Sequence, residues 1–213
     1  GNKEAQKEEV ILLKIKDNLE AGISIRALDF SEDDYLEFVK PLQFITDKPV
    51  MYVCNVDEDS AVSGNSYVNL VKENVAIENA EVLVLAVGTE ADINELDDYE
   101  ERKMFLQDIG LDEPGSAKLI RSAYKLLTLQ TYFTAGVKEV RAWTINVGSS
   151  APQAAGVIHT DFEKGFIRAE VIAYTDFVNF GSEAKVKEAG KMRVEGKNYT
   201  VKDGDVMHFL FNV

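Results

Sequence analysis

A short apolar run that stops at a polar turn constrains the fold of this chain most. Residues 50–54 are continuously apolar, rich in β-branched and aromatic side chains, and preceded by Pro49. Such a run is typical of a strand buried on both faces, as in the parallel sheet of an α/β domain. It ends at Asn55, and acidic residues follow as far as Glu58. Because open α/β sheets bind ligands at the carboxyl ends of their strands, we expect residues 55–58 to lie at a ligand site.

A second apolar run predicts a strand that pairs with the first. Residues 82–87 are continuously apolar and close on Gly88 and Thr89, while residues 67–76 have helical spacing. Two buried strands joined by a helix predict a parallel βαβ unit, which places the loop at 86–89 beside the loop at 55–58. Further amphipathic helices are expected over 95–106 and 117–129.

The first 46 residues have a helical pattern. Apolar positions between residues 10 and 19 recur at three- and four-residue spacing, and Gly22 is placed to end this helix. Ser31 and Asp34 form a capping pattern for a second helix, which Pro41 should kink or break. Two such helices predict the end of a helical hairpin; a simple helical cap on the sheet is the alternative.

The sequence changes character from Thr128 onwards. Short strands are expected over 140–145, 166–173, 198–201 and 206–211, and residues 202–205, Lys-Asp-Gly-Asp, give a strong turn signal. Short strands around brief helices predict a β-grasp fold for residues 128–213. The fold class expected for the whole chain is therefore α/β followed by α+β.

Charge and composition limit the classes of partner. The composition, 46% hydrophobic and 28% charged, is that of a globular protein, and no apolar run approaches the ~20 residues of a membrane span. Residues 129–213 have equal numbers of acidic and basic residues, so the net charge of −14 falls on residues 1–128. We expect no membrane and no DNA partner, a cytoplasmic location, and any RNA contact in the second part of the chain. The single cysteine, Cys54, is expected to be a small core residue in a reducing compartment.

Basic residues of the second part are candidates for contact with RNA or another partner, and solvated surface is the alternative for each. The candidates are Lys138, Arg141, Arg168, Lys191, Arg193 and Lys197. No metal site is expected. His159, Asp161 and Glu163 alternate, but they are better interpreted as a strand-to-helix turn with Asp161 as the N-cap.

The run that ends in Asn-x-x-Glu resembles the base-recognition motif of the YchF-type ATPases, a branch of the Obg family of P-loop GTPases. Most members of that superfamily have Asn-Lys-x-Asp, whose Asp accepts the two N–H donors of guanine. Here Val56 replaces the Lys and Glu58 the Asp. The resemblance implies that ATP is accepted over GTP, with Asn55 shaping the loop, the Val56 backbone near the base and Glu58 at its edge.

The second part resembles the TGS domain of the same family. The Val-x-Asp-Gly-Asp-Val sequence at 201–206 is similar to the last hairpin of TGS domains. Longer stretches that look like the YchF-type TGS domain are found at 129–136, 137–143, 151–156 and 159–166. These matches cover most of residues 115–213.

The resemblance implies that the chain is the C-terminal portion of a YchF-type protein. Residues 1–46 would be a helical-arm remnant, 47–127 the C-terminal part of the nucleotide-binding domain, and 128–213 the TGS domain. No Gly-x-x-x-x-Gly-Lys-Ser/Thr occurs in the sequence, so the phosphate-binding loop and magnesium ligands are expected upstream in the parent. We therefore expect no catalytic residue, no bound cofactor and no nucleotide hydrolysis in this fragment alone.

The parent would bind ATP or GTP with Mg²⁺ and act at the ribosome or ribosomal RNA through its TGS domain and helical arm. The alternative is a non-enzymatic β-grasp adaptor that binds RNA or a protein partner. A regulatory small-molecule site on the sheet is a third possibility, for which the sequence offers no convergent polar cluster.

Overall fold

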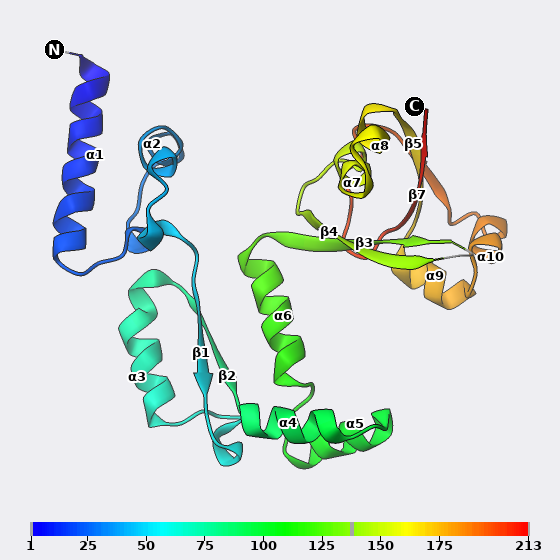
Figure 1. The fold of residues 1–213 in the computed structure, drawn as a ribbon, viewed down its shortest axis with the longest axis horizontal. Helices are drawn as coiled ribbons and strands as arrows, with labels where there is room; N and C mark the ends of the chain where they lie inside the picture. Colours follow the sequence, from blue (N-terminus) through cyan, green and yellow to red (C-terminus); the bar gives the residue numbers. More distant parts are fainter. Residues whose placement is uncertain (1, 137–138, 213) are drawn as a thin grey trace. The chain divides into compact units, whose positions relative to one another are not determined.

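The computed structural model describes residues 2–136 and 139–212, which belong to two compact units, Gly1–Leu126 and Leu127–Val213 (Figure 1). The first unit contains α1 (Lys3–Glu20), α2 (Glu32–Asp34), β1 (Met51–Asn55), α3 (Ser66–Val75), β2 (Glu81–Leu85), α4 (Val87–Glu95), α5 (Tyr99–Asp108) and α6 (Gly115–Leu126). The second contains β3 (Leu129–Ala135), β4 (Val140–Asn146), α7 (Ala151–Ile158), α8 (Thr160–Lys164), β5 (Phe166–Ile172), α9 (Tyr174–Phe180), α10 (Glu183–Glu188), β6 (Arg193–Glu195) and β7 (Val206–Phe211).

The first unit contains the predicted parallel strand pair. β1 and β2 run in register from Met51 opposite Glu81 to Asn55 opposite Leu85, and α3 connects them. β2 is shorter than the sequence predicted, because the chain turns into α4 at Val87. The side chain of Asn55, the last residue of β1, accepts the N–H of Val87, and Val87 begins α4 instead of continuing the strand.

Two predicted helices of the first unit have different bounds in the structure. The helix expected over 95–106 is divided between α4 and α5, because the Asp98 carboxylate accepts the N–H groups of Glu100 and Glu101 at 2.8 and 3.1 Å and begins a new helix. The helix expected over 117–129 ends at Leu126 instead, and the left-handed backbone of Thr128 separates it from β3.

The N-terminal segment does not form a hairpin of two long helices. α1 packs Ile11 and Ile15 against a cluster that includes Val39. Ser31 accepts the N–H of Asp34 at 3.2 Å, as the capping pattern predicted. α2 then passes into a π-helical turn, η2 (Tyr35–Val39), and a 3-10 turn, η3 (Lys40–Leu42). Pro41 lies in that last turn, where it lacks the N–H that a continuing helix would need.

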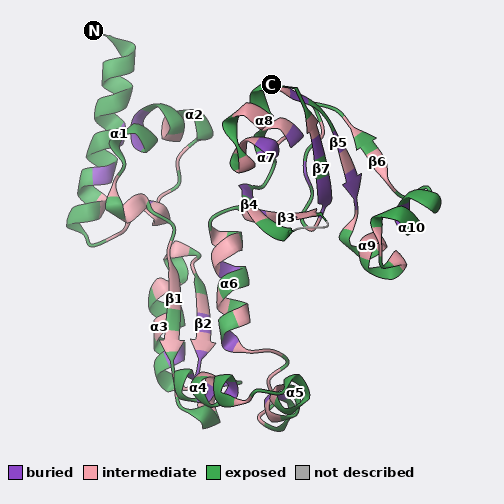
Figure 2. Cartoon of the chain, turned by 45° about the vertical axis from the view of Figure 1, so that its right-hand side comes forward, coloured by how far each residue is buried: buried purple, intermediate pink, exposed green. Residues whose placement is uncertain are grey.

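The second unit is a mixed sheet with helices on both faces. Its strand order is β4-β3-β7-β5-β6; β3 and β7 are parallel and the other pairs antiparallel. α7 packs on one face, where Tyr132 is fully buried and donates its hydroxyl hydrogen to the Ala154 carbonyl at 2.8 Å. α9 and α10 cover Ile172 and Val206 on the other face. In Figure 2 the buried residues of this unit are concentrated in β5, β7 and α7.

One predicted strand of the second unit is absent. Residues 198–201 belong to no strand in the described part of the chain, and only an isolated bridge joins Thr200 to Ser150. The Asp205 carboxylate holds this segment as a loop by accepting the backbone N–H of Lys202 at 3.0 Å.

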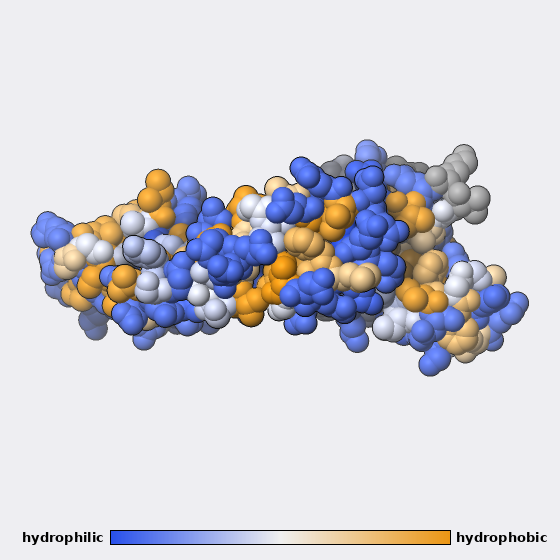
Figure 3. Space-filling model, turned by 90° about the horizontal axis from the view of Figure 1, so that it is seen from below, coloured by the Kyte–Doolittle hydropathy of each residue, from blue (hydrophilic) through white to orange (hydrophobic). Residues whose placement is uncertain are grey.

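The surface of the described residues is mixed in character. Apolar side chains lie among hydrophilic ones on the face drawn in Figure 3. Exposed apolar residues include Val10 and Leu13 on α1 and Tyr67 and Leu70 on α3. Within residues 2–136 and 139–212, no helix has both the length and the apolarity needed to cross a membrane.

Candidate nucleotide-base loop

The Asn55 side chain ties together the loops that follow β1 and β2. Its Oδ1 accepts the backbone N–H of Val87 at 3.1 Å, across from the end of β1 to the start of α4. The next residue, Val56, donates its N–H to the Leu85 carbonyl at 2.9 Å. The loop at 55–58 and the start of α4 therefore lie side by side at the carboxyl ends of the parallel strands.

The two acids of this loop are placed differently. Asp57 is the N-cap of the 3-10 turn η5 (Glu58–Ser60), and its Oδ1 accepts the N–H of Ser60 at 3.0 Å. Glu58 is the first residue of that turn; its side chain is exposed and makes no hydrogen bond or ion pair with any described residue. Asp57 is thus engaged in shaping the turn, whereas the Glu58 carboxylate is free to accept hydrogen bonds from a ligand.

Glu90, a residue of α4 that the sequence analysis did not single out, connects α4 to the start of α6. Glu90 Oε1 accepts the N–H of Gly115 at 2.6 Å, and Oε2 accepts that of Ser116 at 3.1 Å. These are unpaired donors of the first turn of α6, which need acceptors from outside the helix. The only local signal was Pro114-Gly115, which marks a helix start but does not identify its capping partner.

A cavity of about 240 Å³ lies beside this arrangement. It is lined by the end of β2, by Glu90, by the connection between α5 and α6, including Gly110 and Asp112, and by Lys118 of α6. Neither Asn55 nor Glu58 is among the described residues that line it. A ligand bound by the Glu58 carboxylate would therefore lie outside this cavity.

The basic residues predicted for RNA contact are spread over the second unit. Arg141 lies on the α7 side of the sheet, with its guanidinium 4.2 Å from the centre of the Trp143 ring. Arg168 lies on the opposite face, because the buried Ala169 beside it points to α7. Lys191 and Lys197 are exposed on either side of β6. Lys138 falls outside the described residues.

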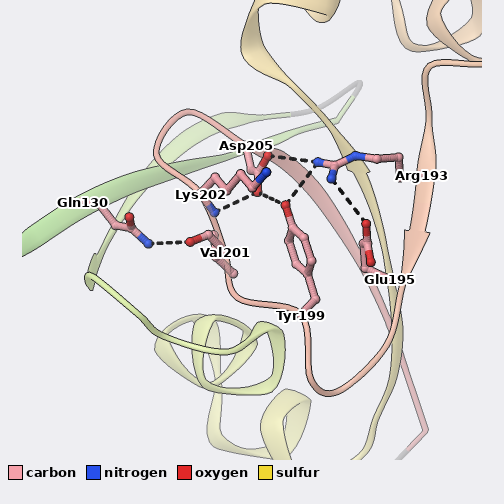
Figure 4. A network of polar contacts seen from close by, with 7 residues as sticks. All are labelled: Gln130, Arg193, Glu195, Tyr199, Val201, Lys202 and Asp205. Carbon is pink, nitrogen blue, oxygen red and sulfur yellow. Dashed lines mark hydrogen bonds and ion pairs between the residues drawn. The ribbon is translucent and has the colours of Figure 1, made fainter.

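Arg193 belongs to a polar network inside the second unit (Figure 4). Its Nη2 lies 3.4 Å from Asp205 and 3.1 Å from the Tyr199 hydroxyl, and its Nη1 lies 3.3 Å from Glu195. Asp205, only 3% exposed, accepts the Tyr199 hydroxyl hydrogen at 2.7 Å. Burial, and then the hydrogen bond to Asp205, raise the pKa of Tyr199 to about 12. The guanidinium of Arg193 thus compensates a buried carboxylate.

The alternating polar residues after α7 form a helix cap. His159 is the N-cap of α8, and its Nδ1 accepts the N–H of Asp161 at 3.2 Å. The expectation that Asp161 itself is the N-cap was therefore wrong, because His159 occupies the extended position one residue before the helix. In the part of the chain that the structure describes, no three His, Cys, Asp or Glu residues are grouped to hold a metal ion.

Known proteins with similar sequences indicate the family of this chain. Residues 129–212 match the family YchF-GTPase_C, described as a protein of unknown function (DUF933). All 213 residues align at 56% identity with the ribosome-binding ATPase YchF of Escherichia coli O157:H7. The chain belongs to the YchF family. It is also 50% identical over 214 aligned residues to the ribosome-binding ATPase YchF of Bacillus subtilis strain 168.

A solved structure gives the same relationship. The structure of the Schizosaccharomyces pombe YchF GTPase superposes with a TM-score of 0.81 at 34% identity, over 97% of this chain and 55% of that one. The chain covers 58% of the bacterial YchF sequences above. It therefore spans a little more than half the length of these YchF relatives, and its mixed α/β fold is that of YchF.

Proposed function

We propose that this chain is the base-reading and docking portion of a YchF-type ATPase. In this proposal, residues 47–127 form the C-terminal part of a P-loop nucleotide-binding domain, residues 1–46 the base of a helical arm, and residues 128–213 a TGS domain. The observation that carries the proposal is the hydrogen bond from Val87 N–H to Asn55, which ties the start of α4 to the loop that contains Glu58. The Glu58 carboxylate is exposed and has no partner among the described residues.

The chemistry of the loop favours adenine over guanine. Guanine offers two adjacent N–H donors that a short Asp carboxylate accepts together, and such bidentate pairs tolerate little displacement. Glu58 carries its carboxylate on a longer side chain, from the first residue of a turn that Asp57 fixes. Adenine has no paired donors at that edge, so its binding does not depend on a bidentate hydrogen bond to the carboxylate. The Val56 backbone, anchored on Leu85, would lie near the base.

The second unit has features that support a docking role. A central parallel pair within the order β4-β3-β7-β5-β6, with α7 packed on one face, supports the proposed β-grasp fold. The named relatives are ribosome-binding ATPases, so ribosomal RNA or protein is the proposed partner of this unit and of the arm. Exposed Arg141, Arg168, Lys191 and Lys197 are the candidate contacts, whereas Arg193 is committed to its internal network.

The phosphates and Mg²⁺ of the nucleotide would be bound by the longer protein. The sequence has no Gly-x-x-x-x-Gly-Lys-Ser/Thr with which to cradle phosphates. Phosphoryl transfer depends on that cradle and on neutralising phosphate charge. The residues of this chain would bind and orient the base, and the 213-residue chain alone would not hydrolyse ATP or GTP.

Nucleotide discrimination by the full-length protein tests the base-reading role. Dissociation constants for ATP and GTP would be measured for the wild type and for Glu58→Asp. The shorter side chain restores the guanine-reading geometry, so the preference should shift toward GTP by about tenfold or more, the equivalent of one charge-assisted hydrogen bond. Asp59→Glu is the matched control, because Asp59 lies in the same turn, is exposed and has no partner among the described residues. Unchanged ATP/GTP discrimination in Glu58→Asp would contradict the proposal.

Sedimentation with ribosomes separates this function from that of an adaptor. A YchF-type ATPase should bind ribosomes in a manner that depends on the nucleotide supplied to the full-length protein. Equal co-sedimentation with ATP, with GTP and without nucleotide, together with no hydrolysis by the full-length protein, would instead favour a β-grasp adaptor.

A further inference from the structure

Glu90 occupies a particular position between the base loop and α6. It lies three residues after Val87, in the first turn of α4, and is half-buried. Its two carboxylate oxygens each accept one backbone N–H from the start of α6, Gly115 at 2.6 Å and Ser116 at 3.1 Å. A negative charge there also complements the positive end of the helix dipole.

The start of α6 is packed too closely for a side chain at Gly115. A Cβ on this residue would overlap the Leu85 side chain and lie 3.0 Å from Glu90 Oε1. Leu85 is the last residue of β2, and its carbonyl accepts the N–H of Val56 in the base loop. The helix terminus is therefore seated on the same strand end that supports the base loop.

The first turn of α4 is consequently anchored from two sides. Asn55 holds it from β1 by accepting the N–H of Val87, and α6 holds it through the carboxylate of Glu90. If the second anchor is lost, Glu90 no longer fixes α4 against α6, and the position of the Val87 N–H relative to Asn55 is less restrained. A change at Glu90 then reaches residues 55–58 although Glu90 itself does not contact the base.

We infer that Glu90 is a positioning residue for purine binding, which aligns the Asn55 loop through α4 and the start of α6. This inference rests on the proposed base-reading function of residues 55–58. A purely structural cap would stabilise α6 without changing the affinity for the base of a nucleotide, whereas a positioning residue changes that affinity.

The test uses the full-length protein and two ligands, ATP and inorganic tripolyphosphate. Glu90→Gln removes the charge and turns one acceptor into a donor, and Glu90→Asp keeps the charge but shortens the reach to α6. Both variants should weaken ATP binding by about tenfold, comparable to the loss of one hydrogen bond of this kind. Tripolyphosphate has no base, so its affinity should not change. Should Glu90→Gln not fold, Glu90→Asp is assessed by the same two affinities.

Two further variants make the outcomes distinguishable. Asp92→Asn removes the same charge from an exposed position of α4 that has no partner among the described residues, and should bind ATP as the wild type does. Asn55→Ala removes the first anchor and should weaken ATP binding. Wild-type ATP affinity in the Glu90 variants, with a loss in Asn55→Ala, overturns the inference alone. An equal loss of ATP and tripolyphosphate binding also overturns it, because that reports general destabilisation. No effect in either Glu90 or Asn55 variants overturns the base-reading function itself.

Discussion

Gly115 at the start of α6 lies against the side chain of Leu85 at the end of β2, with no space for a Cβ between them. The contact is between a helix terminus and a buried residue at the end of a strand, so neither can move away without opening the core of the first unit. Leu85 is 7% exposed, and Gly115 is buried.

Gly115→Ala should therefore destabilise the first unit by about 1–3 kcal/mol, as overpacking does in other cores. The matched control is Gly88→Ala in α4, where a Cβ would meet no atom within 4 Å. That control should leave the free energy of unfolding unchanged or raise it by up to about 1 kcal/mol, because alanine favours helix. Urea unfolding followed by circular dichroism at 222 nm measures both. Equal stability of the two variants would show that α6 can shift away from Leu85.

Asp205→Asn should destabilise the second unit by about 1.5–3 kcal/mol. The amide keeps one acceptor but cannot balance the charge of Arg193 while accepting hydrogen bonds from Tyr199 and Lys202. Trp143, the single tryptophan, lies on β4, so its fluorescence reports unfolding of this unit. Glu188→Gln, an exposed change on α10 with no partner among the described residues, should have no measurable effect. If both variants unfold at the same urea concentration, the network contributes little.

The raised pKa of Tyr199 predicts a loss of stability at alkaline pH. Below pH 10.0, the ordinary pKa of a tyrosine, the phenol is neutral in both states and its stabilising contribution is fully present. Between pH 10.0 and about 12 the unfolded chain loses this proton first, so the free energy of unfolding falls as the pH rises. Trp143 fluorescence in urea at several pH values should show this fall. Tyr199→Phe should remove part of it, and an identical slope in the variant would contradict the assignment.

Arg26 should contribute to the stability of the first unit far more than a surface arginine does. It donates to Glu78 at 3.0 Å and to the Thr46 carbonyl at 3.0 Å, while the Tyr52 hydroxyl donates to the same carboxylate oxygen of Glu78 at 2.8 Å. Arg26→Met leaves Glu78 without its counter-charge and should cost about 3 kcal/mol. Arg121→Met, which breaks the exposed pair with Glu113, should cost less than about 1 kcal/mol. Circular dichroism in urea compares the two.

The Arg26–Glu78 pair also predicts a loss of stability at acid pH. Arg26 and Tyr52 hold the pKa of Glu78 below its usual value of 4.5. Its stabilising contribution is present above pH 4.5 and is lost as the pH falls toward the lower pKa of the folded state. The free energy of unfolding of the wild type should therefore fall more steeply below pH 4.5 than that of Arg26→Met. Parallel pH profiles for the two proteins would show that Glu78 is not coupled to Arg26.

Local sequence signals were sufficient to predict β1 and β2, the strands whose ends form the candidate site. The apolar run before Asn55 predicted β1, and the second run predicted its parallel partner. The expected burial of β1 on both faces was wrong, because its only described neighbour in the sheet is β2 and Val53 is 44% exposed. Parallel strands end at one edge, which is why Asn55 and Val87 are near one another. The role of Glu58 at a base edge stays a prediction.

Contacts between distant residues were not predictable from local pattern. Glu90 and Gly115 are 25 residues apart, and no spacing rule connects a glutamate in one helix to the start of another. Arg193 looked like surface charge because its partners, Tyr199 and Asp205, are brought to it only by the folded loop. The end of β2 was misplaced because Val87 has a strand-like side chain, whereas its backbone is captured by Asn55.

The position of β7 has a consequence for how the second unit is completed. This strand comes last in the sequence, yet it lies between β3 and β5 and supplies Met207 and Phe209 to the core. During synthesis the earlier strands must wait, without their shared neighbour, until residues 206–211 have left the ribosome. Such long-range closure is slow, and it exposes apolar edges in the meantime. A nascent chain stalled or cut before Val206 would therefore lose the middle of its sheet rather than its border, and would be a substrate for chaperones or proteases.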